Sequence, residues 1–402
     1  MTPFHTGVSL AAPSRRDDRI DFLRGLALLT IFIDHVPKNA FEPFTLHAYA
    51  FSDAAEVFFF ISGYVAALVY GRTMERKGFV AAAKRVWRRA GVVYGAQFAL
   101  LAVVLSLVWV LLAATGDQTF RWMFRVQWVY EAPLAYALPA LTLHYQPGYL
   151  DILPSYVLLL VAFPLVLKGL GRSLWLVLVP SAALWLAVQV FGITLWTTNG
   201  EGWFFNPFAW QFIFVLGAVF GHPAQKQRMA FLDSPLLFWA ASGLVALIAV
   251  VQVSYFLSGP LPVVPNLRPA NLPIDKTTLS PLRLVSFLAL AVVVRRVLPP
   301  VGTLQRYWPA LAVIRCGRAS LQVFSFGVAL SSLTAVSFIL GGGNLLLQSL
   351  LCVAGVGAQF AYAAHREHMQ EDRAAVRAPV LAPAVFRTAR LQETERPWER
   401  EG

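Results

Sequence analysis

Long apolar runs recur along the whole 402-residue chain, as in helical membrane proteins that cross the bilayer many times. Hydrophobic residues make up 57% of the chain and charged residues only 13%. A soluble protein carries about 25% charged residues. In the bilayer core a helix satisfies its backbone hydrogen bonds within itself. The pattern therefore predicts an all-α, polytopic membrane protein that resides in a lipid bilayer.

The hydropathy fits about ten transmembrane helices. We expect a cytoplasmic N-terminal segment at 1–19, a membrane domain at 20–365 and a disordered cytoplasmic tail at 366–402, which is charged and contains Pro and Ala. The predicted spans are 20–37, 52–71, 90–114, 152–167, 173–192, 206–221, 235–257, 281–298, 318–339 and 343–364.

The distribution of Lys and Arg predicts the orientation of these helices. If the N-terminus is cytoplasmic, the cytoplasmic segments hold most of the 33 basic residues. Such a bias is the positive-inside signature. It predicts a multi-pass protein of the bacterial inner membrane with both termini in the cytoplasm. It also accounts for the net charge of +12 without a nucleic-acid partner. The basic residues outside the cytoplasmic segments are Lys38, Arg121, Arg125, Arg268, Lys276 and Arg283.

Charged and titratable residues within the first apolar run are the first candidates for function. Arg24 and His35 lie eleven positions apart, about three helical turns, so they share one helix face about 16 Å apart. Asp34 precedes His35. Ionisable residues inside a membrane are costly and usually functional. We predict a polar track along this face, with His35 as its catalytic end.

A neutral imidazole backed by a carboxylate is a general base. Asp34 is a poor orienting group for His35, because adjacent helix residues point about 100° apart. Glu56, near the start of the next span, is expected at the same depth and is the preferred orienting carboxylate, with Asp34 second. A contact that only packs two helices is the alternative interpretation.

A basic run precedes the third predicted span and includes Arg85, Arg88 and Arg89. Guanidinium groups bind phosphates through paired hydrogen bonds. Together with Arg24 these residues are candidates for binding a phosphorylated donor. Ordinary positive-inside charge would explain the same run.

Polar and aromatic residues of the outer segments are candidates for an acceptor site. Aromatic faces with carboxylate and amide partners suit a carbohydrate, although interfacial aromatic belts and helix caps explain the same residue types. The candidates are Tyr149, Asp151, Trp203, Asn206, Trp210, Asp275 and Lys276.

Several of these segments resemble a known family. Residues 19–25, 34–35 and 56–64 resemble the opening of the membrane acyltransferases of acyltransferase family 3, which carry an Arg-or-Lys, ten-residue, His motif. Residues 149–154, 206–211, 275–283 and 317–324 are similar to the OpgC branch, the succinyltransferases of osmoregulated periplasmic glucans. The resemblance extends from residue 19 to about 364, but Thr278 stands where that branch leads us to expect Asn.

The resemblance implies that His35 is the acyl-transfer base, that Arg24 belongs to its motif, and that Arg85, Arg88 and Arg89 match the arginine motif of the acyl donor. It implies transfer of an acyl group, most simply succinyl, from cytoplasmic acyl-CoA to hydroxyls of a periplasmic glucan. Acyl-CoA would be a co-substrate; no permanently bound cofactor and no metal are expected.

Two alternatives share these features. An enzyme that O-acetylates another envelope polysaccharide would use the same catalytic residues. A glycan or lipid transporter would also place ionisable groups inside a membrane domain. The sequence leaves the oligomeric state, the acyl group and the acceptor position open, and it does not distinguish direct transfer from an acyl-histidine intermediate.

Overall fold

The computed structural model describes residues 17–37, 39–260 and 263–377, and within them the regular structure is helical apart from one isolated bridge between Trp196 and Gly202. The all-α prediction is confirmed. The helices are α1 (Asp18–Asp34), α2 (Ala54–Thr115), α3 (Thr119–Met123), α4 (Gln127–Glu131), α5 (Pro133–Leu141), α6 (Ile152–Leu170), α7 (Trp175–Phe191), α8 (Pro207–Gly221), α9 (Pro235–Ser258), α10 (Pro281–Val297), α11 (Trp308–Arg318), α12 (Ser320–Leu340) and α13 (Leu345–Arg377), with short 3₁₀ turns η1 (Glu42–Phe44), η2 (Leu46–Ala48), η3 (Pro223–Asp233) and η4 (Leu304–Arg306).

Five of the described helices are long and apolar enough to cross a membrane: α2, α6, α9, α12 and the 345–373 part of α13. Each of the ten predicted spans overlaps a helix, but ten membrane crossings remain a prediction. The difference arises because α1, α7, α8 and α10 are short, and because α1 and α10 carry charged side chains at both ends.

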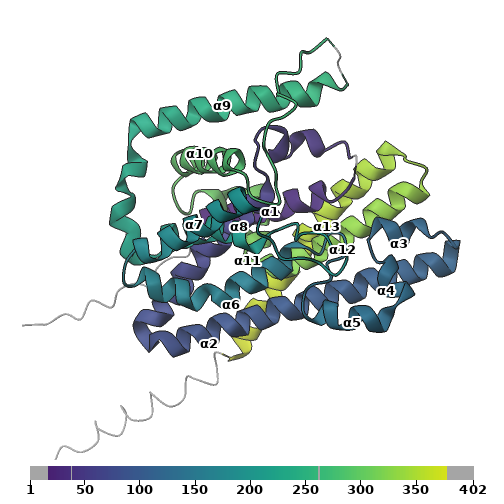
Figure 1. Ribbon diagram of the computed structural model, residues 1–402, viewed down its shortest axis with the longest axis horizontal. Helices are drawn as coiled ribbons and strands as arrows, with labels where there is room; N and C mark the ends of the chain where they lie inside the picture. The colour runs from purple at the N-terminus through teal and green to yellow at the C-terminus, as the bar shows by residue number, and fades with distance from the viewer. Residues whose placement is uncertain (1–16, 38, 261–262, 378–402) are drawn as a thin grey trace, which may run out of the picture.

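Helix α2 contains two of the predicted spans. Its backbone leaves helical geometry at Gly78, where φ is +79°, a conformation that glycine adopts without steric cost. Figure 1 shows the ribbon of α2 changing direction between its two halves. The spans predicted at 52–71 and 90–114 lie on either side of this break, and the basic run follows it.

The central helices approach each other closely through glycine. A Cβ added at Gly63 of α2 would overlap the carbonyl oxygen of Phe214 in α8. Gly25 of α1 and Gly317 of α11 face each other in the same way, since a Cβ on Gly317 would overlap the carbonyl oxygen of Asp21. Small residues let helix backbones approach when lipid supplies no hydrophobic drive. These contacts fix α1 and α2 against the rest of the bundle.

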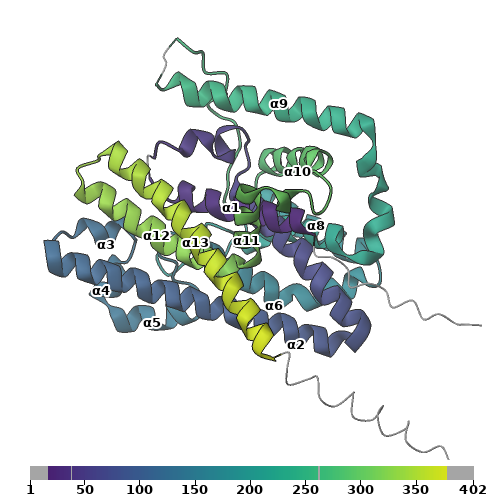
Figure 2. The same cartoon turned by 180° about the vertical axis from the view of Figure 1, so that it is seen from behind.

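Helix α9 stands apart from the other long helices in both views (Figures 1 and 2). Among the described helices it packs mainly against α10. A cavity of about 1710 Å³ lies beside it, lined by residues of α1, α2, α8, α9 and α10.

Helix α13 continues past the predicted end of the membrane domain. Residues 366–377 are helical rather than disordered, and Glu367 accepts hydrogen bonds from Arg315 and Arg318, both at 2.6 Å. The ion pairs tie this part of α13 to α11. The remainder of the predicted tail, 378–402, and the segment 1–16 lie outside the described residues.

Candidate active site

His35 is the residue that ends α1. Its ring Nδ1 lies 2.5 Å from the carbonyl oxygen of Ile31, one turn earlier. A carbonyl only accepts, so Nδ1 carries the hydrogen of this bond, and the neutral ring keeps its lone pair on Nε2. The local helix geometry therefore sets the tautomer of His35 and leaves Nε2 as a proton acceptor.

His35 lines a small cavity of about 40 Å³ where five chain segments meet. Asp34 and His35 come from the end of α1, and Asp53 precedes α2. Asp151 precedes α6, and Lys276 comes from the loop before α10. The other lining residues are Ile31, Ala54, Ala55, Ile152 and Phe205. Three predicted site residues distant in sequence, His35, Asp151 and Lys276, therefore share one cavity.

Tyr149 forms part of the surroundings of His35. The two rings lie with centroids 5.2 Å apart and planes tilted by 55°. Tyr149 adopts a positive φ of 68°, which is uncommon for a residue with a large side chain. A constrained backbone thus places the tyrosine beside the imidazole, as expected for a residue near the reacting groups.

The position of Lys276 is fixed by an ion pair of its side chain and by a hydrogen bond to its backbone carbonyl. Its ammonium lies 2.7 Å from Asp53, and its carbonyl accepts a hydrogen bond from the indole of Trp210 at 3.1 Å. Burial alone lowers the pKa of Lys276, but the carboxylates of Asp53 and Glu56 raise it overall. The lysine therefore presents a positive charge to the cavity.

Two more backbone carbonyls of the loop that carries Lys276 accept hydrogen bonds from side chains of α7. Trp185 donates to Leu279 at 2.9 Å and Gln189 donates to Thr278 at 2.7 Å, both from α7. Asp275 is exposed and accepts hydrogen bonds from the backbone and hydroxyl of Thr278, at 2.7 and 2.6 Å. Asp275 thus shapes this turn, while Lys276 reaches the cavity.

Glu56 lies elsewhere than the sequence interpretation placed it. It is fully buried, and its Oε1 accepts a hydrogen bond from Arg283 at 2.7 Å. Its Oε2 accepts from the backbone N–H of Asp53 at 2.8 Å. The carboxylate of Asp53 in turn accepts from the backbone N–H of Ala55 and caps α2. Both oxygens of Glu56 are engaged, so the predicted pairing of Glu56 with His35 is not what the geometry shows. The Asp53-x-x-Glu56 spacing is a capping box and could have revealed this from the sequence.

Two other acceptor candidates have structural roles. The side-chain oxygen of Asn206 caps α8 by accepting a hydrogen bond from the backbone N–H of Phe208. The side-chain nitrogen of Asn206 donates to the carbonyl of Ile193 at 2.7 Å. Trp203 is buried, and its ring lies edge-on to His144 with centroids 6.2 Å apart. These contacts order the segment between α7 and α8, and neither residue lines the His35 cavity.

The basic residues follow the break at Gly78, beyond the end of the first half of α2 that lies away from Asp53. Arg85 donates to Thr73 at 2.9 Å, and Thr73 follows Ala54 by nineteen residues, a rise of about 28 Å. Arg85 and Arg88 are exposed and Arg89 is partly exposed. This separation is close to the thickness of a bilayer's apolar core.

The face of α1 between Arg24 and His35 is packed with apolar side chains. Arg24 itself is partly exposed, whereas Ala27, Leu28 and Ile31 are buried. The predicted polar track is therefore interrupted by apolar side chains on this face, one of which, Ala27, lines the large cavity.

The large cavity offers a different connection. One end is lined by Arg19, Arg295 and Arg296, of which Arg19 pairs with Asp17 and Arg295 with Asp233. The wall of the cavity includes Tyr64 and Ala54 of α2. Ala54 follows Asp53 and also lines the small cavity. From Tyr64 to Ala54 the helix rises about 15 Å. The large cavity thus extends from a basic end to the wall of the His35 cavity.

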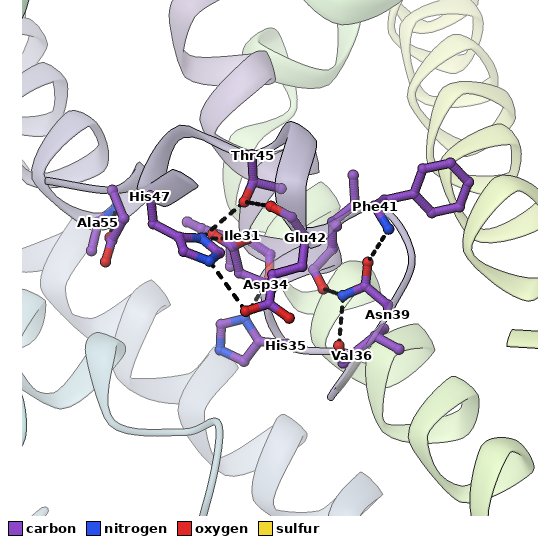
Figure 3. Close-up of polar contacts among 12 residues, drawn as sticks. Ile31, Asp34, His35, Val36, Asn39, Phe41, Glu42, Thr45, His47 and Ala55 are labelled. Atoms are coloured by element: carbon purple, nitrogen blue, oxygen red, sulfur yellow. Dashed lines mark hydrogen bonds and ion pairs between the residues drawn. The ribbon is translucent and has the colours of Figure 1, made fainter. Parts of the chain in front are cut away.

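His47, which the sequence interpretation did not select, belongs to the same region. Its Nδ1 lies 3.4 Å from Asp34, and Figure 3 shows Asp34 next to the rings of both His35 and His47. Asp34 therefore faces a second histidine as well as the cavity. Only its position in the loop after His35 could have suggested this contact.

Comparison with known proteins is consistent with this arrangement. A family model described as OpgC protein matches residues 16–371, which include every residue of the small cavity. No curated protein and no solved structure matches the chain. Because the match covers most of its length, the chain belongs to the OpgC protein family.

Proposed function

We propose that the chain is a membrane acyltransferase that moves an acyl group, succinyl in the simplest case, from acyl-CoA to a hydroxyl of a periplasmic glucan. Membership of the OpgC family supports the reaction class. The observation that carries the proposal is the ring of His35, which lines a cavity while Ile31 holds its Nδ1 hydrogen. That arrangement prepares Nε2 to accept a hydroxyl proton.

The proposed reaction is a direct transfer. Nε2 of His35 takes the proton of the acceptor hydroxyl as its oxygen attacks the thioester carbonyl. The C–S bond then breaks, and the imidazolium returns the proton to the departing thiolate. The ammonium of Lys276 faces the same cavity and would stabilise the negative charge that develops on the carbonyl oxygen. Asp34 would stabilise the imidazolium.

The donor is proposed to occupy the large cavity. Its phosphates would bind near Arg19, Arg295 and Arg296, and its extended arm would follow α2 from Tyr64 toward Ala54. The basic run at Arg85 and Arg88 is the competing phosphate site from the sequence. The large cavity is preferred because its wall reaches the small cavity at Ala54.

The proposed setting is the bacterial inner membrane, with both termini in the cytoplasm. The excess of Lys and Arg in the segments assigned to that side supports this orientation. It places the basic end of the large cavity on the acyl-CoA side and His35 toward the periplasm.

Mass spectrometry of periplasmic glucans tests the proposal in cells. The samples are wild type, a deletion, His35→Ala, and His368→Ala as a matched control at an exposed histidine of α13. We expect an acyl mass on the glucan in wild type and in the control, and its loss in the other two with normal glucan amount. Unchanged glucan in the deletion would exclude this acceptor, and loss of the glucan itself would favour transport.

A further inference from the structure

The surroundings of His47 fix its protonation state. Thr45 donates its hydroxyl hydrogen to the carbonyl of Glu42 at 2.8 Å, so it accepts from Nδ1 of His47, also at 2.8 Å. The other ring nitrogen, Nε2, lies 3.3 Å from the carboxylate of Glu42. Both nitrogens face acceptors, and an imidazole that donates from both is an imidazolium.

Asp34 is the second carboxylate of this cluster. Its Oδ1 lies 3.4 Å from Nδ1 of His47, and the side chains of both residues are largely buried. The Nδ1 hydrogen is directed to Thr45, so Asp34 contacts the ring as an ion pair. This contact with Asp34, outweighing burial, raises the pKa of His47 above its ordinary value of 6.5. One imidazolium thus lies between two carboxylates, Asp34 and Glu42 (Figure 3).

The remaining neighbours of His47 add no further carboxylate. From α9, Gln252 donates to the carbonyl of His47 at 2.9 Å, and Phe256 packs on the ring with centroids 5.3 Å apart. On this side Arg268 donates to Gln252 at 3.4 Å. In this region the described charges that face the ring directly are therefore Asp34 and Glu42.

We propose that His47 is a positioning residue for the transfer reaction: as an imidazolium it holds the carboxylate of Asp34 in place beside His35. This inference rests on the proposed function. Oδ1 of Asp34 is buried and accepts no hydrogen bond among the described residues, so the ion pair with His47 is the contact that orients this oxygen. With the cation removed, the negative charge of Asp34 acts on His35 uncompensated and keeps that base protonated at higher pH.

Kinetics of the purified full-length protein test the role in catalysis. We expect His47→Gln to lower kcat about tenfold, equivalent to about 1.4 kcal/mol, and to move the acid limb of the pH–rate profile to higher pH. The KM for acyl-CoA should stay within about twofold. His47→Lys, which keeps a cation, should recover part of the rate and of the profile. An unchanged profile in His47→Gln, or equal loss in both variants, would overturn the proposal.

A second measurement does not depend on activity. NMR titration of isotope-labelled histidine in the wild-type protein should show His47 titrating above its ordinary range. Asp34→Asn and Glu42→Gln should each lower that midpoint. A midpoint unaffected by Asp34→Asn would overturn the inference even if transfer is observed. If wild type transfers no acyl group, the proposed function fails, while this titration still decides whether His47 holds Asp34 as an imidazolium.

Discussion

The chemistry of the site depends on which ring nitrogen of His35 carries hydrogen, and the backbone decides this. At the end of α1 the carbonyl of Ile31 accepts from both the backbone N–H and the ring Nδ1 of His35. In many histidine bases a carboxylate performs this task. Here the carboxylates Asp34 and Asp151 line the cavity instead, where they can stabilise a positive charge that forms on His35.

The indole of Trp210 provides a test of how Lys276 is positioned. Trp210→Phe keeps an aromatic ring against Phe59 and Phe205 but removes the hydrogen bond to the carbonyl of Lys276. We expect kcat to fall about fivefold, since a hydrogen bond contributes about 1 kcal/mol. Acyl-transfer kinetics measure this, with Trp196→Phe in an exposed part of the same region as control. A rate equal to that of the control variant would mean that Trp210 does not position the lysine.

The His47 cluster also predicts a pH dependence of stability. Because the folded state raises the pKa of His47 above 6.5, its contribution is fully present below that value and is lost as the pH rises through the raised pKa. The thermal midpoint of wild type should exceed that of His47→Gln near pH 6, and the difference should shrink toward pH 9. A difference that grows with pH would contradict the ion cluster.

At the level of helices, periodic apolar runs are visible in the sequence, and contacts between distant helices are not. All ten predicted ranges overlap helices because apolar length alone specifies them. The partner of Glu56 was missed because Arg283 lies 227 residues later, so no local pattern joins the two. The spans at 52–71 and 90–114 were separated around Gly78, but no local pattern showed that the charged segment between them is helical on both sides of this glycine.

Close packing of α2 against α8 predicts unequal effects of two glycine substitutions. Gly63→Ala places a methyl group against the carbonyl oxygen of Phe214, whereas Gly91 of the same helix has open space around it. Overpacking costs about 1–3 kcal/mol, while Gly91→Ala should gain stability from helix propensity. Thermal unfolding in detergent with a size-exclusion check measures both. Equal midpoints for the two variants would show that the close contact is not needed.

At the scale of the whole molecule, the large cavity joins regions that the sequence keeps apart. Arg19 lies near the N-terminus and Arg295 in α10, yet both line the same end of this cavity. The basic donor site and the catalytic role of His35 stay predictions. The sequence did not show that His35 shares a cavity with Asp151 and Lys276, and it suggested a donor route along α1. That route is interrupted by the buried side chains of Leu28 and Ile31, whereas Leu26 and Ala27 of α1 line the large cavity.

The two possible phosphate sites make different predictions for donor binding. Arg295→Gln combined with Arg296→Gln should raise the KM for acyl-CoA about tenfold, because guanidinium–phosphate contacts are lost. Arg85→Gln combined with Arg88→Gln should leave the KM within about twofold if the large cavity holds the donor. Titration of acyl-CoA at fixed acceptor concentration measures both pairs. The reverse pattern would move the donor to the basic run.

The central claim is that His35 transfers an acyl group to a glucan hydroxyl. Its most direct test is a reconstituted assay: the purified protein in lipid nanodiscs, labelled succinyl-CoA and unsubstituted periplasmic glucan, with the product mass measured over time. We expect a succinyl mass on the glucan with wild type and with His368→Ala, and none above background with His35→Gln. Transfer by His35→Gln at the wild-type rate would contradict the account.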